Sequence, residues 1–212
     1  MADIRESGAV PAADGRRRCP WAGTTAEYQA YHDGEWGRPV ADDARLYEKL
    51  CLEGFQSGLS WLTILRKRPA FRQAFAGFEP EKVAGFDDGD VERLLGDAGI
   101  VRHRGKIEAA IANARATLAV RADRGSLAAL VWEFEPARRG RAVPVRLVDL
   151  APQTPESVGL SKALRRYGFR FVGPTTAYAA MQSLGLVNDH LQGCHVRAAC
   201  EAERRRMSLP GR

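Results

Sequence analysis

The 212-residue sequence lacks any apolar run that approaches the ~20 residues needed to cross a bilayer. Its first residues also lack the apolar segment of a secretory signal. Cysteine is scarce, with four residues, so a disulfide framework is not expected. These absences predict a protein of the reducing cytoplasm without membrane contact, whose cysteines serve as thiols or metal ligands.

Alternating apolar and polar runs typical of strands are also missing, and there is no internal repeat. Hydrophobic residues make up 45% of the chain, enough to build a core for one globular unit or two small lobes. The clearest helix is predicted from about 105 to 122, where Ile107, Ile111, Ala114 and Leu118 form one face. The fold class is therefore predicted to be all-α.

Capping and breaker residues predict the other helices. Asp42 and Asp43 are good N-caps for a helix that continues through Cys51. Another helix is predicted over 59–68. It is expected to end at Arg68, because the residue before a proline is biased away from helical backbone. Shorter helices are expected at 80–84 and 90–95, and a final helix pair at 161–167 and 174–184.

Composition divides the chain into three parts. Residues 1–18 mix Ala, Gly, Pro and charge without periodicity, which predicts a flexible leader. Residues 19–196 are expected to form one domain with two helical lobes, in which 135–155 is a connector rich in Pro and Arg. Residues 197–212 are expected to be a basic tail. The net charge of +6 is only weakly indicative of nucleic-acid binding, because much of it lies at the two ends.

One acidic residue, Glu53, lies in a nearly uncharged, glycine-punctuated run at 51–61, after a turn-rich heptad at 31–37. An isolated carboxylate is costly to bury unless another group pairs with it. Four aromatic residues flank it in the sequence: Tyr28, Tyr31, Trp36 and Trp61. The pattern indicates a pocket for a flat ligand that is cationic or donates hydrogen bonds. The alternative is an ordinary aromatic core with Glu53 on the solvent side of a helix.

Two pairs of potential metal ligands lie at opposite ends of the chain. Cys19 and His32 are separated by twelve residues, and His190 and Cys194 by three. Thiolates and imidazoles favour zinc in a tetrahedral site, which would join the N-terminal segment to the C-terminal one. Alternatively, the histidines lie in loops and the cysteines are core thiols, and His195 is a competing ligand.

Two glycines, Gly168 and Gly173, enclose a short link between the last two predicted helices. Glycine turns and helix N-termini expose N–H groups that bind phosphate, and Arg165, Arg166 and Arg170 add positive charge. Such contacts position a protein on DNA without reading its sequence. The alternative is a plain hairpin of two helices with a glycine C-cap.

Several sequence blocks resemble the DNA-3-methyladenine glycosylase I family, a branch of the helix-hairpin-helix glycosylases. These blocks are CPW at 19–21, YHDGEWG at 31–37, CLEG at 51–54, GLSW at 58–61, DAGI at 97–100, RHRGKI at 102–107 and GLVNDH at 185–190. The resemblance implies an all-α, two-lobed fold with alkylated double-stranded DNA between the lobes and a structural zinc. It also implies hydrolysis of the N-glycosidic bond of 3-methyladenine after the base is flipped out. A monomer that needs no nucleotide cofactor is expected.

The resemblance also implies a role for each candidate residue. Glu53, the expected catalytic residue, and Tyr31 would hydrogen-bond the base, and Trp61 would stack on it. The other pocket aromatics would be Tyr28, Trp21 and Trp36. The zinc ligands would be Cys19, His32, His190 and Cys194. The turn with Gly168, Arg170 and Gly173 would hold the phosphate backbone.

Two departures from other helix-hairpin-helix glycosylases bear on the mechanism. Pro174 and Thr175 stand where members with lyase activity place a lysine, so cleavage of the DNA strand is not expected. Asn188, with Asp189 beside it, stands near the position where most members place a catalytic aspartate, so the role of Asp189 is open. A rival interpretation is a zinc-stapled module that recognises damaged DNA without cleaving the base.

Overall fold

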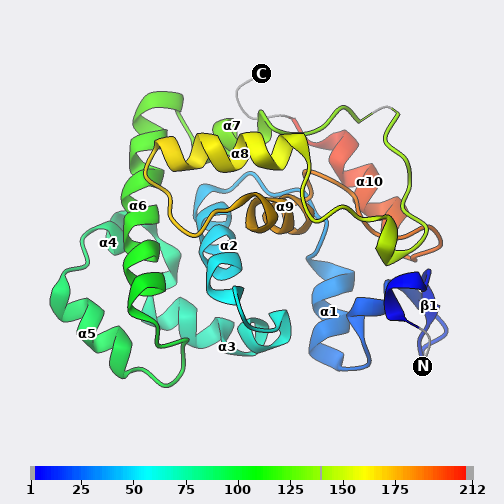
Figure 1. Ribbon diagram of the computed structural model, residues 1–212, viewed down its shortest axis with the longest axis horizontal. Helices are drawn as coiled ribbons and strands as arrows, with labels where there is room; N and C mark the ends of the chain where they lie inside the picture. The colour runs from blue at the N-terminus through cyan, green and yellow to red at the C-terminus, as the bar shows by residue number, and fades with distance from the viewer. Residues whose placement is uncertain (1–2, 139, 209–212) are drawn as a thin grey trace.

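Ten α-helices make up most of the residues that the computed structural model describes, 3–138 and 140–208 (Figure 1). They are α1 (Ala26–Gly34), α2 (Asp43–Gln56), α3 (Trp61–Ala74), α4 (Pro80–Ala84), α5 (Asp88–Gly96), α6 (Arg104–Arg124), α7 (Leu127–Trp132), α8 (Pro155–Arg166), α9 (Pro174–Ser183) and α10 (Arg197–Arg206). The prediction of a mostly helical protein is confirmed. None of the helices within the described ranges is long and apolar enough to cross a membrane.

The remaining regular elements are short. Four 3₁₀ helices are η1 (Ile4–Glu6), η2 (Pro20–Ala22), η3 (Ala76–Phe78) and η4 (Leu147–Asp149). Strands β1 (Val10–Pro11) and β2 (Arg17–Arg18) form an antiparallel pair in which Val10 faces Arg18.

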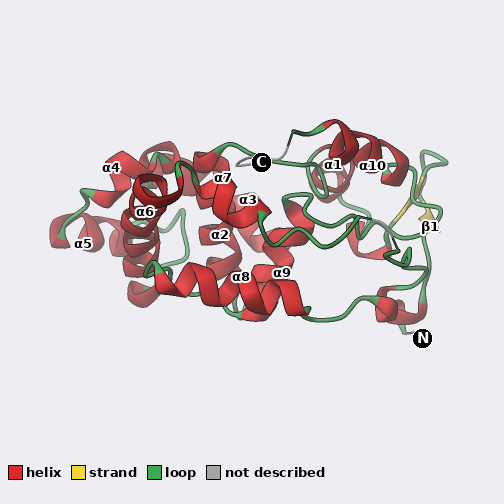
Figure 2. Ribbon diagram, turned by 90° about the horizontal axis from the view of Figure 1, so that it is seen from above, coloured by secondary structure: helices red, strands yellow, loops and turns green. Residues whose placement is uncertain are grey.

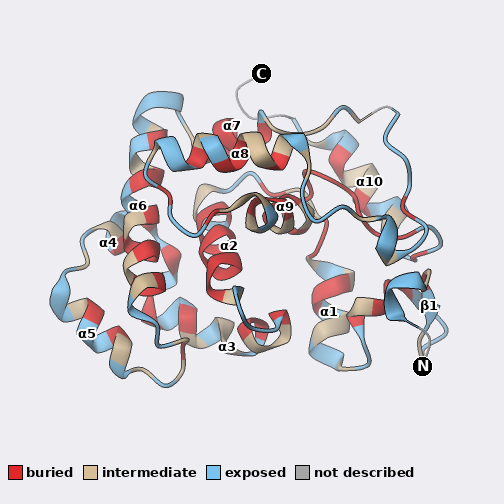
Figure 3. Cartoon of the chain, in the orientation of Figure 1, coloured by how far each residue is buried: buried red, intermediate tan, exposed pale blue. Residues whose placement is uncertain are grey.

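Helix α2 lies at the centre of the core and is buried along most of its length (Figure 3). It contacts α3, α6, α7 and α9. Phe55, near its C-terminal end, packs against Phe71 of α3 with ring centroids 4.6 Å apart. Because α2 is enclosed by other helices, a polar side chain on its inner face has to find a partner within the protein.

Local sequence signals fix the ends of α2 and α3. Asp42 caps α2 by accepting a hydrogen bond from the Arg45 N–H at 2.9 Å, as predicted. Ser60 caps α3 by accepting from the Thr63 N–H at 3.2 Å. Between them Gly58 has φ +82°, a left-handed conformation that glycine adopts without strain. This tight turn brings the last residues of α2 close to the first residues of α3.

The N-terminal elements lie at one end of the molecule (Figure 1). The N-terminal β pair and α1 lie there with α10, whereas α4, α5 and α6 form the opposite end. Seen from above, α8 and α9 lie on one side and α10 lies on the other (Figure 2).

The predicted end of the third helix before Pro69 is wrong, because α3 continues through this proline to Ala74. A proline inside a helix costs about 3 kcal/mol. The continuation buries Phe71 completely and leads directly to the fully buried Phe75. Burial of each of these side chains stabilises the fold by roughly 1.5–3 kcal/mol. Tertiary burial therefore offsets the local penalty.

Residues 31–34 belong to helix α1 rather than to a turn, and α7 was not predicted. Helix α8 begins at Pro155, six residues before the predicted start at 161, with a capping box between Thr154 and Ser157. Both short helices, α1 and α7, are stabilised by contacts with the rest of the core more than by their own periodicity.

The division of the chain into a flexible leader, one domain and a basic tail stays a prediction, and the structure describes parts of both terminal segments. Within 3–18, Ala9 is buried, and Arg18 is buried against Asp14 and Asp33. Within 197–208, α10 buries Cys200 and Arg204. Residues 1–2 and 209–212 of these two segments lie outside the described residues, and the assignment of 19–196 as one domain stays a prediction.

Candidate functional site

A cavity of about 220 Å³ opens between α1, α2, α3 and α9. Six of its lining residues are those predicted from the sequence: Trp21, Tyr28, Tyr31, Trp36, Glu53 and Trp61. The structure thus brings together residues from η2, α1, the following turn, α2 and α3. Their assignment to ligand binding stays a prediction.

Four further lining residues were not predicted: Gln56, Leu150, Ala179 and Gln182. Gln56 follows Glu53 by three residues on α2, so helical periodicity could have found it. The other three come from the connector and α9, which are distant in sequence, and no local signal points to them.

Glu53 is buried, with 7% of its surface exposed, so the alternative of a solvent-facing helix residue is wrong. Its Oε1 lies 3.2 Å from Nζ of Lys49, one turn earlier on α2. Burial raises the pKa of Glu53, and the Lys49 ammonium opposes that rise. Lys49 therefore offsets part of the cost of burying a charged carboxylate.

Lys49 is a further residue of the site that was not predicted, although its spacing of four residues from Glu53 on α2 was a usable signal. Its Nζ donates a hydrogen bond to the Tyr31 hydroxyl at 2.5 Å. It also lies 3.5 Å from the centre of the Trp61 ring, a cation–π arrangement. Burial lowers the pKa of Lys49, and Glu53 opposes this shift.

The aromatic walls meet at tilted and edge-on angles. Trp21 and Trp36 have ring centroids 4.8 Å apart, and Tyr31 and Trp61 have centroids 5.3 Å apart. The Nε1 of Trp61 is buried and finds no hydrogen-bond partner in the described part of the chain. The cavity thus offers flat aromatic surfaces to a ligand.

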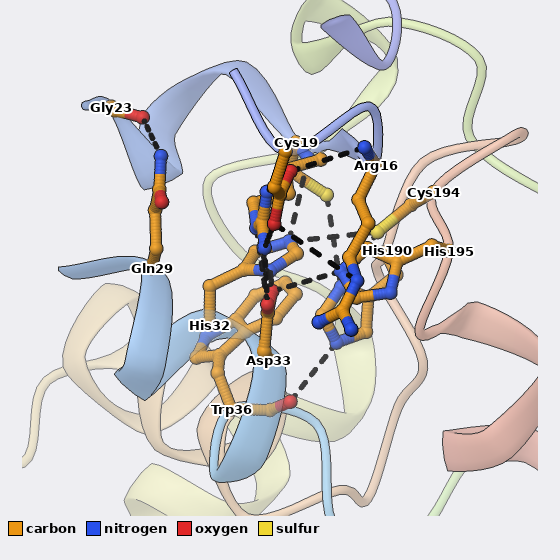
Figure 4. Close-up of polar contacts among 12 residues, drawn as sticks. Arg16, Cys19, Gly23, Gln29, His32, Asp33, Trp36, His190, Cys194 and His195 are labelled. Carbon is orange, nitrogen blue, oxygen red and sulfur yellow. Dashed lines mark hydrogen bonds and ion pairs between the residues drawn. The ribbon is translucent and has the colours of Figure 1, made fainter. Parts of the chain in front are cut away.

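The four predicted metal ligands come together beside this cavity (Figure 4). Cys19, His32, His190 and Cys194 are all buried, with one ligand atom of each within 4.8 Å of the others. Sγ of Cys194 lies 3.6 Å from Nε2 of His32 and 3.5 Å from Nδ1 of His190. A tetrahedral zinc with ordinary bond lengths holds sulfur and nitrogen ligands roughly 3.5 Å apart. The donor set and its spacing therefore fit a metal ion.

Neighbouring groups orient both imidazoles. His32 Nδ1 lies 2.7 Å from Asp33 Oδ1, which directs Nε2 into the cluster. His190 Nε2 donates to the Trp36 carbonyl at 3.0 Å, which directs Nδ1 inwards. Such outer partners are typical of metal-binding histidines. The hydrogen bond between the two thiols lowers the pKa of Cys194 and raises the pKa of Cys19.

His195, the competing ligand, lies outside this group of four. Its Nε2 lies 3.0 Å from Oδ1 of Asp33. Asp33 also receives hydrogen bonds from the buried guanidinium of Arg18. His195 thus takes part in the arrangement that holds Asp33 against His32.

Asp189 and Asn188 are buried, and neither lines the aromatic cavity. Asp189 accepts hydrogen bonds from Arg141 at 2.6 Å, Tyr178 at 2.7 Å and Gln182 at 2.8 Å. A carboxylate whose oxygens already accept hydrogen bonds from three donors has little capacity left to activate water.

The turn between α8 and α9 is exposed at Arg170 and Phe171. Asn113 of α6 fixes it from below, since its Oδ1 accepts from the Arg170 N–H at 2.7 Å and its Nδ2 donates to the Arg170 carbonyl at 3.2 Å. Gly168 has φ +96°, where a side chain would be strained. The predicted turn is thus present, and its contact with DNA stays a prediction.

The family model described as methyladenine glycosylase matches residues 21–198. An Escherichia coli K12 protein named DNA-3-methyladenine glycosylase 1 is 48% identical over 177 residues, 84% of this chain and 95% of that protein. A Haemophilus influenzae protein named DNA-3-methyladenine glycosylase is 44% identical over 84% of this chain and 96% of its own.

Solved structures agree with these matches. A crystal structure of 3-methyladenine DNA glycosylase I has a TM-score of 0.81 and 48% identity, over 84% of this chain and 98% of that one. A Staphylococcus aureus structure described as the basis of 3-methyladenine recognition has a TM-score of 0.81 and 36% identity, over 85% of this chain and 96% of that one.

Proposed function

Because the chain belongs to the methyladenine glycosylase family, we propose that it excises 3-methyladenine from alkylated DNA in base-excision repair. The reaction is hydrolysis of the N-glycosidic bond that joins the damaged base to deoxyribose. The names of the relatives support this activity. The observation that carries the proposal is a cavity with aromatic walls around a buried, paired carboxylate.

The chemistry of the lesion explains why such a cavity is sufficient. In DNA 3-methyladenine carries a formal positive charge, so its bond to the sugar is already weakened and the base leaves without being protonated. The enzyme has to select the base, hold it outside the duplex and stabilise the positive charge that develops on the sugar. No strong general acid is required.

Aromatic contacts supply part of the selection. Stacking is worth ~1–3 kcal/mol per base, and a cation–π contact adds ~0.5–2 kcal/mol. Neutral adenine gains only the first of these terms. Lys49 lies over one face of Trp61, so the other face is the one against which a flipped base stacks.

Glu53 supplies the electrostatic part of the selection. It accepts hydrogen bonds from the edge of the base, and its charge favours a cationic base over neutral adenine. The ammonium of Lys49 keeps the carboxylate ionised in spite of its burial. Tyr31 is held by Lys49 and lies at the same wall of the cavity.

The reaction ends with base release and leaves the DNA strand intact. Pro174 and Thr175 begin α9 and offer no amine for a Schiff base. Asp189, the alternative to Asn188 as a catalytic group, is already bound by three donors and serves to hold Arg141 and α9 in place. Trapping with borohydride on DNA with an abasic site should therefore give no covalent adduct.

A structural zinc is the cofactor that the Cys19, His32, His190 and Cys194 cluster would hold. Support comes from the burial of all four, their spacing and the oriented imidazoles. A bound zinc would cross-link the N-terminal segment to the C-terminal one. This role is structural, because all four protein ligands leave no open position for a substrate.

DNA is held by a helix-hairpin-helix motif formed by α8, α9 and the turn with Gly168, Arg170 and Gly173. The exposed Arg170 and the free N–H groups at the start of α9 suit phosphate oxygens. In this proposal alkylated duplex DNA lies between two helical lobes, and the enzyme acts as a monomer in the cytoplasm.

Release of free base distinguishes a glycosylase from a module that only binds damaged DNA. Methylated duplex DNA is incubated with the protein, and the soluble fraction is separated by chromatography. We expect free 3-methyladenine in an amount that increases with time. Binding to methylated DNA without release of base would support the binding module and overturn the proposed activity.

A further inference from the structure

A second cavity, of about 530 Å³, lies between α10 and residues 136–143 of the connector. Figure 1 shows the connector passing over α10, and Figure 2 shows α10 on the side of the molecule opposite α8 and α9. The cavity is therefore separate from the proposed DNA-binding turn, and it shares no lining residue with the aromatic cavity.

Arginine dominates its lining. Five arginines line the cavity: Arg138, Arg141, Arg197, Arg204 and Arg205. Three carboxylates offset part of their charge: Glu201 in the lining, Glu135 beside Arg138 and Arg204, and Asp189 beside Arg141. Five positive and three negative groups leave two positive charges, so the cavity attracts anions.

Two buried polar atoms of residues that line this cavity have no partner within the described residues, Oδ1 of Asn188 and Nε of Arg204. The Asn188 amide is oriented by its own contacts, because Nδ2 donates to the Arg197 carbonyl at 3.0 Å and to Glu201 at 3.3 Å. Its Oδ1 is thus an acceptor without a donor, in a side chain that is 1% exposed. A ligand that carries both acceptors and a donor would satisfy both atoms.

The family match covers part of this cavity, including Arg138, Arg141 and Arg197. It ends at residue 198, whereas Glu201, Arg204 and Arg205 come later in α10. The match to each of the two relatives spans 84% of this chain. It spans 95% of the Escherichia coli protein and 96% of the Haemophilus influenzae protein. Two of the five arginines, Arg204 and Arg205, therefore lie beyond the residues that the family model matches.

We propose that this cavity binds a small phosphate monoester whose organic part donates a hydrogen bond through a hydroxyl or amino group. A guanidinium group binds two phosphate oxygens at once through two parallel hydrogen bonds. In this proposal Asn188 Oδ1 accepts a hydrogen bond from the organic part of the ligand. The volume lies within the range of about 300–1,000 Å³ usual for small-molecule sites.

One carboxylate connects this cavity with the aromatic one. Arg141 lines the arginine cavity and donates to Asp189 Oδ1, while Gln182 lines the aromatic cavity and donates to Asp189 Oδ2. A phosphate that competes for Arg141 weakens its pair with Asp189 and frees Gln182 to shift. Bound ligand is thus expected to change the rate of base excision, an effect that rests on the proposed function.

Binding is tested on the full chain by isothermal titration calorimetry with ribose 5-phosphate, ribose and inorganic phosphate, without any measurement of activity. We expect one molecule of ribose 5-phosphate per chain, no binding of ribose, and weaker binding of inorganic phosphate. Equal affinity for inorganic phosphate and ribose 5-phosphate would overturn the role of the organic part. Absence of binding by both phosphates would overturn the site itself.

Matched charge reversals on α10 test the location. Arg205→Glu should weaken binding of ribose 5-phosphate at least roughly tenfold, because a contact between a cation and phosphate becomes a repulsion. Arg206→Glu changes the net charge equally on the next residue, which is exposed and does not line the cavity, and should leave affinity within about twofold. Similar losses in both variants would mean attraction to a basic helix and would overturn the site. Melting curves of the variants, with the more conservative Arg205→Gln included, show whether a loss of binding comes from misfolding.

Discussion

At the scale of single residues, the Lys49–Glu53 pair is the feature on which recognition depends. Both side chains are buried, and each opposes the pKa shift that burial imposes on the other. Breaking a buried pair on one side leaves the other charge uncompensated. A variant of Glu53 therefore tests both base selection and the pair.

We expect Glu53→Gln to lower the single-turnover rate of 3-methyladenine excision by about tenfold or more, because a hydrogen bond to a charged partner is worth roughly 1.5–3 kcal/mol. The matched control is Glu48→Gln, which removes another buried, paired carboxylate from α2 at a position that does not line the aromatic cavity. Its excision rate should stay near that of the unmodified protein. Equal rates in folded Glu53→Gln and the unmodified protein would contradict the assignment.

The pH dependence follows from the same carboxylate. Burial raises the pKa of Glu53 above its ordinary value of 4.5, so excision should fall on the acid side at a pH above 4.5. A raised pKa also means that Glu53 contributes most to stability below its unfolded value and that this contribution is lost as pH rises through the folded value. The free energy of unfolding of Glu53→Gln, compared with that of the unmodified protein at the same pH, should therefore be more favourable at neutral pH than at acid pH. Excision rates and melting curves from pH 4 to 8 measure both effects, and an unchanged acid limb in Glu53→Gln would assign it to another group.

At the scale of elements, the turn between α8 and α9 is a rigid projection. Asn113 bonds both backbone polar groups of Arg170, so the turn is positioned from α6 before any ligand arrives. A pre-positioned turn loses little conformational entropy on binding a phosphate.

Arg170→Ala should weaken binding to damaged and undamaged duplexes by similar factors, since phosphate contacts do not distinguish bases. The slope of log affinity against log salt should become shallower by about one unit. Arg206→Ala, on the opposite side of the molecule, is the control. Fluorescence anisotropy at several salt concentrations measures both, and a loss restricted to damaged DNA would place Arg170 in base recognition.

At the scale of the whole molecule, the Cys/His cluster connects segments that are more than 150 residues apart, as in the contact between Cys194 and His32. A cross-link between distant segments restricts the unfolded chain strongly. Metal binding and global stability should therefore change together.

Cys194→Ser should remove zinc and lower the melting temperature by roughly 5 °C or more, given that ~2–4 °C corresponds to each kcal/mol in a chain of this size. The control is Cys200→Ser, which replaces another buried thiol of the C-terminal region outside the cluster and should retain the metal. Elemental analysis and thermal melting are the measurements. A metal-free protein of full stability after ordinary purification would disprove the zinc site.

What the sequence determined by itself is local or chemical in nature. The Asp42 cap and the period of α6 predicted their helices, because capping and amphipathicity act within a few residues. The donor chemistry of Cys19 and His32 indicated a metal site. The aromatic residues that flank Glu53 in the sequence indicated the cavity, and the family resemblance added Trp21 to its lining.

Only the tertiary structure decided the rest, because burial and long-range pairing outweigh local preference. It continued α3 through Pro69, which buries Phe71. It also placed Arg204 of α10 against the distant Glu135. It also paired Glu53 with Lys49 and bound Asp189 to Arg141. Each of these outcomes depends on which side chain is desolvated and which partner lies within reach, and these are properties of the packed chain.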